Sequence, residues 1–205
     1  MNAFYKLDAQ SLEIAERLAV QSEGAAAVCE LAFGHTTLAK SLAFSTTLSH
    51  YLGIDSDENA VASATMDFSE DDRFDFSCVT LQDWHPSASF DVCTASRIFH
   101  HLPPEDATSV LRKMATAIGH AGRLILLDSL RDYRGRNGRW LYLPYFFIST
   151  LTQQVPRERL EVERPSGVAV ADAYYCLVAD LSLEAWRFQL QLFPPSGATE
   201  RSNVK

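Results

Sequence analysis

Short apolar runs alternate with amphipathic stretches along the first two thirds of the chain. Apolar runs bounded by turn residues are typical of buried strands, and the spacing between them is typical of helices. The predicted strands cover Ala25–Leu31, Leu48–Ile54, Phe74–Leu81, Phe90–Ser96 and Arg123–Leu130, and the predicted helices cover Asp8–Gln21, 38–43, 58–68 and 105–118. This alternation predicts an α/β fold, with a doubly wound, mostly parallel sheet and helices on both faces.

The last third of the chain is less regular. The aromatic segment Trp140–Gln154 predicts a helix interrupted near Pro144, and Val170–Leu181 predicts another helix. Ala185–Phe193 alternates polar and apolar residues like a strand, and the tail after it is expected to be flexible. We expect one domain over 1–205, with a core over about 8–130, a substrate or lid region over 131–193 and the tail over 194–205.

Composition narrows the class of protein. A net charge of −8 argues against a nucleic-acid surface, because such a surface needs a basic field. The four cysteines form no CxxC pair and no Cys/His metal spacing, so we expect no metal site and a reducing, cytoplasmic setting. Three of them, Cys29, Cys78 and Cys93, fall in strand-like runs and are expected to be buried.

The chain also lacks the sequence signals of membrane insertion and secretion. Its longest apolar run, Trp140–Ile148, is far shorter than the ~20 residues of a membrane helix. The N-terminus has no apolar core of the secretory type. We therefore expect a protein without an integral membrane segment.

Candidate functional residues follow the predicted strands. Ligands of an open parallel sheet bind outside the carboxyl ends of its strands, where the strand order reverses. The residues at these positions are Glu30 to Thr36, Asp55, Asp83 with Trp84, Arg97 to Leu102, and Asp128 with Ser129.

In this order the segments resemble the successive motifs of class I S-adenosylmethionine-dependent methyltransferases. The similarity is carried by ELAFGHTTLAKSLA, YLGIDSDENAVASA, LQDWHPSASFDV and FHHLPPEDATSVLRKMATAIGHAGRLILLDS, over roughly Ala26 to Ser129. The resemblance implies a Rossmann-like fold, S-adenosylmethionine as cofactor and methyl transfer as the reaction. Methyl transfer mainly needs an acceptor held close and in line.

The resemblance also implies roles for individual residues. Glu30 and Gly34 match the family's acidic residue and glycine-rich turn, and Asp55 matches the acid that binds the ribose hydroxyls. Asp83 matches the acid near the adenine amino group, with Trp84 as a cover for that ring. The implied cofactor-binding residues are Glu30, Ala32, Gly34, His35, Asp55, Ser56, Asp83, Trp84 and Ser96.

Simple chemistry supports these roles. A carboxylate accepts both hydrogen bonds of a vicinal diol, and a turn with little side chain lets backbone N–H groups approach a ligand. A second interpretation of Asp55, as the N-cap of the following helix, stays open at this point.

The chain departs from the family pattern at three places. Ala32, Gly34 and Thr36 stand where the family usually has three glycines. His120-Ala121-Gly122 replaces a frequent Pro-Gly-Gly before the fifth strand. The family's sheet closes with an antiparallel pair, of which only Ala185–Phe193 is evident, so we expect the last strands to be remodelled or missing.

Two histidines are the candidates for catalysis. His100 and His101 follow the fourth strand, at the rim where an acceptor would lie. A histidine suits the deprotonation of a phenol, hydroxyl or amine, although one of the pair could serve only in packing. An acidic substrate or the cofactor carboxylate could be bound by Arg131, Arg134, Arg136 and Arg139, which could equally form a solvated loop. A lid over an apolar acceptor, or else core or a dimer contact, could be formed by Tyr142, Tyr145, Phe146 and Phe147.

Three functions are compatible with the sequence. The first is methyl transfer to a small apolar or aromatic metabolite. The second is a repurposed domain that binds a ligand or catalyses another reaction, which Thr36, His120-Ala121 and the missing last strand favour. The third is a partner subunit that dimerises through Trp140–Ile148.

Overall fold

The computed structural model describes residues 26–87, 89–129, 132–134, 140–142, 174–182 and 185–193. The predicted helix Asp8–Gln21, the tail over 194–205 and most of Trp140–Gln154 lie outside these ranges.

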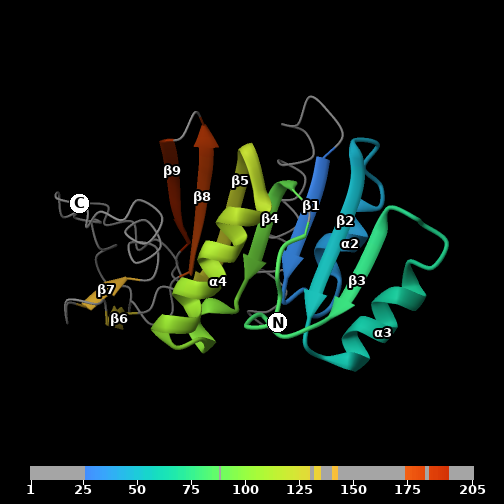
Figure 1. Cartoon of the computed structure of the whole chain (residues 1–205), viewed down its shortest axis with the longest axis horizontal. Coiled ribbons are helices and arrows are strands. Elements are labelled where there is room, and N and C mark those ends of the chain that lie inside the picture. Colours follow the sequence, from blue (N-terminus) through green and yellow to red (C-terminus); the bar gives the residue numbers. More distant parts are fainter. Residues whose placement is uncertain are drawn as a thin grey trace, which may run out of the picture.

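A seven-stranded sheet in the order β3-β2-β1-β4-β5-β8-β9 forms the centre of the molecule (Figure 1). Its strands are β1 (Ala26–Leu31), β2 (Leu48–Asp55), β3 (Phe74–Cys78), β4 (Phe90–Ser96), β5 (Ile118–Ser129), β8 (Tyr174–Ser182) and β9 (Ala185–Phe193). The first five are parallel, and β8 and β9 continue the sheet by antiparallel pairing. The parallel order 3-2-1-4-5 confirms the predicted Rossmann-like sheet.

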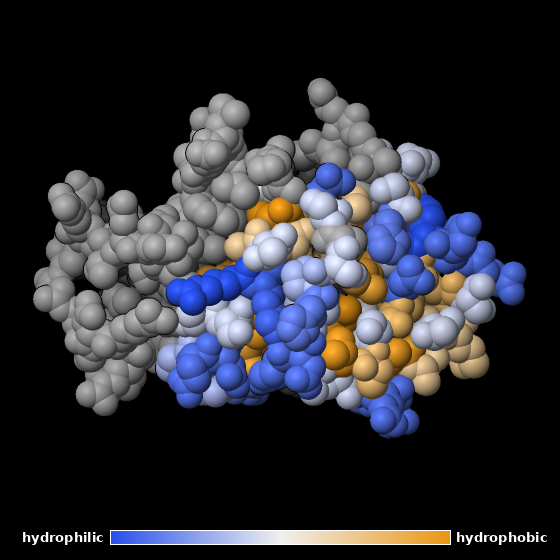
Figure 2. Space-filling view, in the orientation of Figure 1, coloured by the Kyte–Doolittle hydropathy of each residue, from blue (hydrophilic) through white to orange (hydrophobic). Residues whose placement is uncertain are grey.

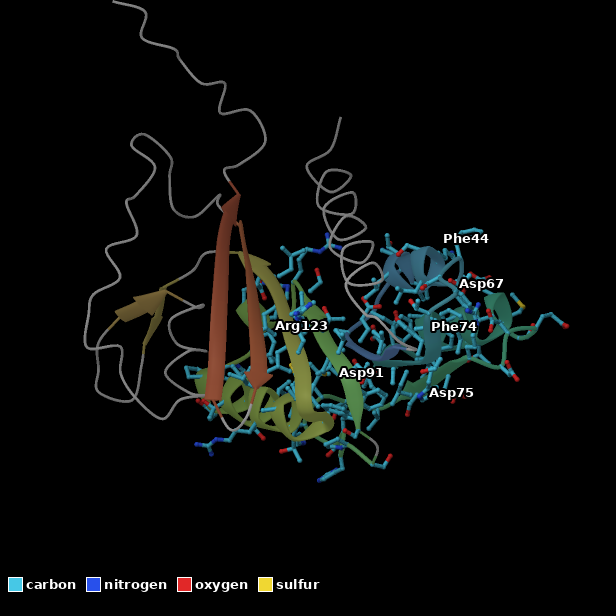
Figure 3. The ribbon with its side chains drawn as sticks, turned by 90° about the horizontal axis from the view of Figure 1, so that it is seen from above. Phe44, Asp67, Phe74, Asp75, Asp91 and Arg123 are labelled. Atoms are coloured by element: carbon cyan, nitrogen blue, oxygen red, sulfur yellow. The ribbon has the colours of Figure 1, made fainter. Side chains whose placement is uncertain are left out.

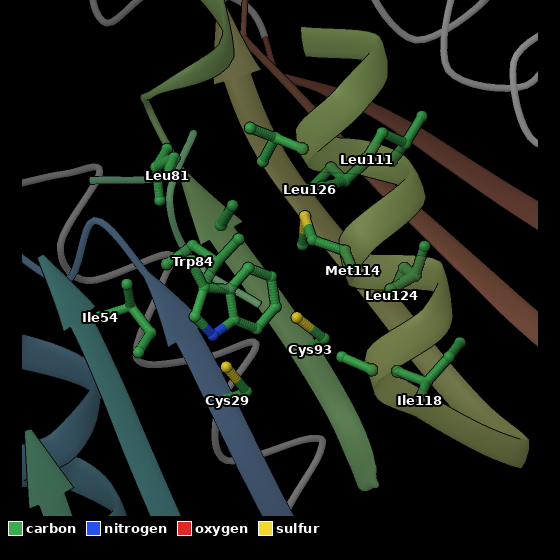
Figure 4. Packing of buried hydrophobic residues seen from close by; sticks show 14 of the residues in the cluster. Cys29, Ile54, Leu81, Trp84, Cys93, Leu111, Met114, Ile118, Leu124 and Leu126 are labelled. Carbon is green, nitrogen blue, oxygen red and sulfur yellow. The ribbon is translucent and has the colours of Figure 1, made fainter. Parts of the chain in front are cut away.

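Helices cover both faces of this sheet, as predicted. Side chains along a strand alternate between the faces, so Val28 and its neighbour Cys29 belong to different hydrophobic clusters. The cluster of Cys29 includes the buried face of α4 (Pro104–Ala117), with Leu111 and Met114 (Figure 4). The cluster of Val28 includes α2 (Thr37–Leu42) on the other face.

Two helix starts follow from local signals. The helix α3 (Glu58–Asp67) begins after Asp57, whose carboxylate accepts hydrogen bonds from the backbone N–H groups of Asn59 and Ala60. The helix α4 begins at a proline and carries Glu105 and Asp106 in its first turn, where the helix dipole favours negative charge. In the view of Figure 1, the surface over α4 is hydrophilic (Figure 2).

The late part of the chain differs from the prediction. The helix predicted over Val170–Leu181 is wrong, because Tyr174–Ser182 forms β8 and pairs along the whole carboxyl half of β5. These non-local hydrogen bonds override the local spacing that favoured a helix. The final antiparallel pair is therefore present, with its first member before β9 rather than after it.

Smaller differences concern strand ends. The segments β6 (Asp132–Arg134) and β7 (Trp140–Tyr142) form a separate two-stranded sheet, and β7 lies where the helix over Trp140–Gln154 was expected. The strand β3 ends at Cys78, three residues earlier than predicted, and Cys78 is exposed rather than buried. No helix in the described ranges is long and apolar enough to span a membrane.

Candidate cofactor and catalytic site

The strand order reverses between β1 and β4, which are neighbours in the sheet. In parallel sheets this reversal opens a crevice at the carboxyl ends of the strands. The loops that follow β1, β2, β3 and β4 all begin at the carboxyl ends of these strands. They therefore surround the candidate site.

The loop after β1 has an alternating left-handed backbone. Ala32, Gly34 and Thr36 have φ angles of 55°, 55° and 56°. These are the three positions where the resembling family has glycines, the residue that adopts positive φ without strain. Ala32 and Thr36 keep the same turn, at a cost of about 1–2 kcal/mol each relative to a right-handed backbone.

Gly34 lies at the open side of this loop. A Cβ atom built on Gly34 would meet no atom of the described residues within 4 Å, apart from its neighbours in the chain, so the space beside it is open among these residues. Its N–H group donates a hydrogen bond to Oδ2 of Asp55, and the N···O distance is 2.9 Å. The neighbouring His35 is exposed, and its carbonyl accepts from Oγ1 of the buried Thr36 at 2.6 Å. The loop thus presents mainly backbone to the crevice.

Asp55 connects the loops after β1, β2 and β3. Besides the bond from Gly34, its Oδ1 accepts from the backbone N–H of Asp57 at 3.0 Å, and its carbonyl accepts from the N–H of Val79 at 2.9 Å. The N-cap of α3 is Asp57, so the alternative interpretation of Asp55 as the cap is wrong. Ser56 is exposed beside it, and its carbonyl lies 3.9 Å from Sγ of Cys78.

Glu30 is buried behind the first loop. Only 6% of it is exposed, and the Tyr51 hydroxyl donates a hydrogen bond to its Oε2. Burial raises the pKa of Glu30 to about 7, the hydrogen bond from Tyr51 opposes this rise, and the negative charge of Asp55 adds to it. Burial and the neighbouring Glu30 also raise the pKa of Tyr51. Glu30 therefore supports the site from within the protein.

The loop after β3 separates the two residues predicted to hold adenine. Asp83 is exposed, and its Oδ2 accepts from Oγ1 of Thr80 at 2.7 Å. Trp84 is 4% exposed and packs in the core with Cys29, Ile54 and Cys93 (Figure 4). This burial leaves little ring surface for a ligand, so Trp84 anchors the loop, and we assign it no ligand contact.

The end of β4 carries an unsatisfied polar atom and a strained residue. Among the described residues, Oγ of Ser96 is the buried side-chain oxygen without a hydrogen-bond partner. The next residue, Arg97, has a φ of 57°, and its N–H donates to the carbonyl of Leu127 at 2.7 Å. The chain therefore turns sharply at the crevice, where strained backbone is often functional.

His100 is held by a carboxylate on the neighbouring strand. Its Nδ1 lies 2.5 Å from Oδ1 of Asp128, and its backbone N–H donates to Oδ2 at 3.2 Å. The Asp128 side chain is 1% exposed, and that of His100 is 15% exposed. His101 is exposed, with its ring centroid 3.8 Å from that of His100. The two predicted histidines are thus in different surroundings.

Asp128 is a residue that the sequence did not single out. It stood among the positions after strands, but nothing marked it apart from other acids in loops. The signal was its place at the end of β5, which pairs in parallel with β4 and so lies beside the loop that holds His100. In the described ranges no group of three or more potential metal ligands occurs.

The comparisons with known proteins agree with this geometry. Residues 28–122 match the model of a methyltransferase domain family. No curated protein sequence matches the chain.

Solved structures share the fold at low sequence identity. The N-methyltransferase NodS of Bradyrhizobium japonicum WM9, in complex with S-adenosylhomocysteine, is 16% identical, with a TM-score of 0.57 over 70% of this chain and 72% of that one. YcgJ of Bacillus subtilis is 22% identical, with a TM-score of 0.51 over 59% of this chain, and the match spans about half, 51%, of its length. DhpI, in complex with S-adenosylhomocysteine, is 19% identical, with a TM-score of 0.51 over 68% of this chain and 67% of that one.

The residues at the crevice suit a nucleoside-bearing cofactor. The free space beside Gly34 admits a ligand to the backbone of the first loop, and Oγ of Ser96 is a buried polar atom that still needs a partner. Residues 28–122 match a methyltransferase domain, and the parallel sheet order agrees with the fold of the S-adenosylhomocysteine-bound methyltransferase NodS.

Proposed function

We propose that this chain transfers the methyl group of S-adenosylmethionine to a small apolar or aromatic metabolite. The observation that carries the proposal is the position of Asp55, whose carboxylate faces the left-handed turn at Gly34 beside the strand-order reversal. When bound, the cofactor supplies an electrophilic methyl group on a positively charged sulfur.

Asp55 has the capacity to bind the ribose diol. Each carboxylate oxygen has two lone pairs, and the N–H groups of Gly34 and Asp57 use one on each oxygen. One lone pair per oxygen remains for the two hydroxyl donors of a diol. Backbone groups of the Ala32–Thr36 loop would lie along the methionine part, with Asp83 near the adenine amino group and Ser96 in the crevice.

His100 or His101 would take the proton that the acceptor loses. Both follow β4 at the rim, where an acceptor would meet the cofactor. The departure Thr36, which favoured a repurposed domain, weighs less here because Thr36 holds the left-handed backbone angle of the glycine that it replaces.

The proposal is tested by titrating the purified chain with S-adenosylmethionine and S-adenosylhomocysteine in a calorimeter. We expect binding of both in the micromolar range, and methylated product with a panel of small aromatic acceptors. Absence of heat with either ligand would refute the proposal. Binding without any methylated product would favour the repurposed domain.

Self-association through Trp140–Ile148 remains a separate proposal, because the side chains of that region lie outside the described residues. Light scattering on the chain and on Phe146→Asp tests it. A monomer in both samples would remove it.

A further inference from the structure

The pair of His100 and Asp128 has a geometry that fixes where the ring proton lies. An ionised carboxylate only accepts hydrogen bonds, so the Nδ1 atom that lies 2.5 Å from Oδ1 must carry the proton. In the neutral ring Nε2 is then an acceptor with a free lone pair. No described residue hydrogen-bonds to this Nε2 atom.

The same carboxylate also fixes the position of the ring. Its second oxygen accepts from the backbone N–H of His100, so one buried group holds both the main chain and the side chain. The Asp128 side chain is 1% exposed, which shields these bonds from competition by water. His101, one residue later, is exposed, and its ring centroid lies 3.8 Å from that of His100.

We propose that His100 is the general base for the acceptor and that Asp128 is its positioning residue, which keeps the proton on Nδ1 and leaves Nε2 open. This proposal rests on the proposed methyl transfer and deepens it, because it names the acceptor class. A base of this kind is needed where the attacking atom carries a proton at neutral pH, as in a phenol or an alcohol. The expected product is therefore a methyl ether.

The O–H bond of the acceptor breaks, its proton goes to Nε2 of His100, and its electron pair forms the new O–CH3 bond. The S–CH3 bond breaks with its electron pair left on sulfur, which becomes a neutral thioether. The imidazolium that forms lies beside the carboxylate of Asp128, which stabilises its charge.

Asp128→Asn gives a sharp test because an asparagine has one acceptor oxygen and one donor NH2 group. If the oxygen keeps the backbone N–H of His100, the NH2 group faces Nδ1 and moves the ring proton to Nε2. Long-range proton–nitrogen NMR spectra distinguish the two tautomers without any acceptor. We expect the Nδ1–H form in the wild-type chain and its loss in Asp128→Asn. A wild-type His100 that carries its proton on Nε2 would overturn the proposal.

Turnover is measured with phenol and with thiophenol, which differ in the need for a base because thiophenol is largely ionised at neutral pH. For phenol, we expect His100→Gln to lower kcat by about 100-fold or more and Asp128→Asn by roughly tenfold or more, with little change in the KM of the cofactor. For thiophenol, both variants are expected to stay within about threefold of the wild type. Equal losses with both acceptors, or a larger loss in His101→Gln than in His100→Gln, would overturn the assignment.

Cofactor binding separates this proposal from the proposed function. S-adenosylhomocysteine is expected to bind His100→Gln and Asp128→Asn as it binds the wild type, and melting curves report whether each variant is folded. If the wild type does not bind S-adenosylhomocysteine, the proposed function fails while the NMR result still decides the pairing. If it binds and methylates thiophenol but neither phenol nor benzyl alcohol, the acceptor class is wrong.

Discussion

The two sides of the crevice hold their carboxylates in different ways. Asp55, on the side of β1 to β3, accepts hydrogen bonds from the backbone N–H groups of Gly34 and Asp57. Asp128, on the side of β4 and β5, accepts from the ring and the backbone N–H of His100. A carboxylate against backbone donors shapes a loop and keeps lone pairs for a ligand. A carboxylate against an imidazole decides which ring nitrogen carries the proton, so the first arrangement suits binding and the second suits chemistry.

The largest expected effect is on the affinity for S-adenosylhomocysteine, which should depend on Asp55 and hardly on Asp128. Asp55→Ala removes the acceptor for the diol and one anchor of the first loop, so we expect the affinity for S-adenosylhomocysteine to fall by about 100-fold, or about 3 kcal/mol. Asp128→Asn is expected to stay within about threefold of the wild type. Calorimetric titration measures both.

A matched control for Asp55→Ala is Asp75→Ala. Asp75 is the second residue of β3, near the amino end of that strand, and its carboxylate lies 3.1 Å from Nε2 of His50 (Figure 3). An equal loss of affinity in both variants would show that the effect of Asp55 is general rather than local.

The next expected effect concerns the pH dependence of the free energy of unfolding. We expect its main source to be Glu30, which lies on the Asp55 side. The pKa of Glu30 is raised from 4.5 to about 7 by burial, so the folded state binds more protons than the unfolded state between these values. The contribution of Glu30 to the free energy of unfolding is therefore largest below pH 4.5. About 3 kcal/mol of this contribution is lost as the pH rises to 7 and beyond. Glu30→Gln removes this loss.

Urea unfolding from pH 5 to pH 8 measures the difference between Glu30→Gln and the wild type. Glu58→Gln, an exposed position in the first turn of α3, is the matched control and should follow the wild type. Parallel curves for Glu30→Gln and the wild type would contradict the assignment of a raised pKa to Glu30.

The smallest expected effect tests the backbone of the Asp55 side. Ala32→Gly replaces a left-handed alanine, so we expect the free energy of unfolding to rise by about 0.5–1 kcal/mol, since the relief of strain exceeds the entropy that glycine adds to the unfolded chain. Ala62→Gly, at an exposed position inside α3, should lower it by about 1 kcal/mol. If both variants changed the free energy of unfolding in the same direction, the result would contradict a left-handed backbone at Ala32.

The early strands and the Asp55 side could be predicted from the sequence because their signals are local. Each strand from β1 to β5 is a short apolar run, and the candidate residues come directly after it. Even the departures Ala32 and Thr36 fall at positions whose backbone is left-handed. The order of these segments along the chain was sufficient to expect the sheet and its crevice.

The errors have non-local causes. Tyr174–Ser182 is a strand because β5 offers it a free edge, and nothing within the segment states that. Trp84 stands next to an exposed acid in the sequence but is buried in the core. Its N–H donates to the carbonyl of Thr80, which closes a turn, and its ring joins Leu81 in the cluster that includes the buried face of α4. Asp128 gained its role only through the parallel pairing of β4 with β5, which brings it to His100.

The position of β8 has a consequence for how such a protein can diverge. In register, Asp128 pairs directly with Tyr175 of β8, so a change in that strand reaches the residue that orients the base through a single neighbour. To reach Asp55 the same change must cross β5, β4 and β1. We therefore expect substitutions in β8 to alter the surroundings of Asp128 more readily than those of Asp55.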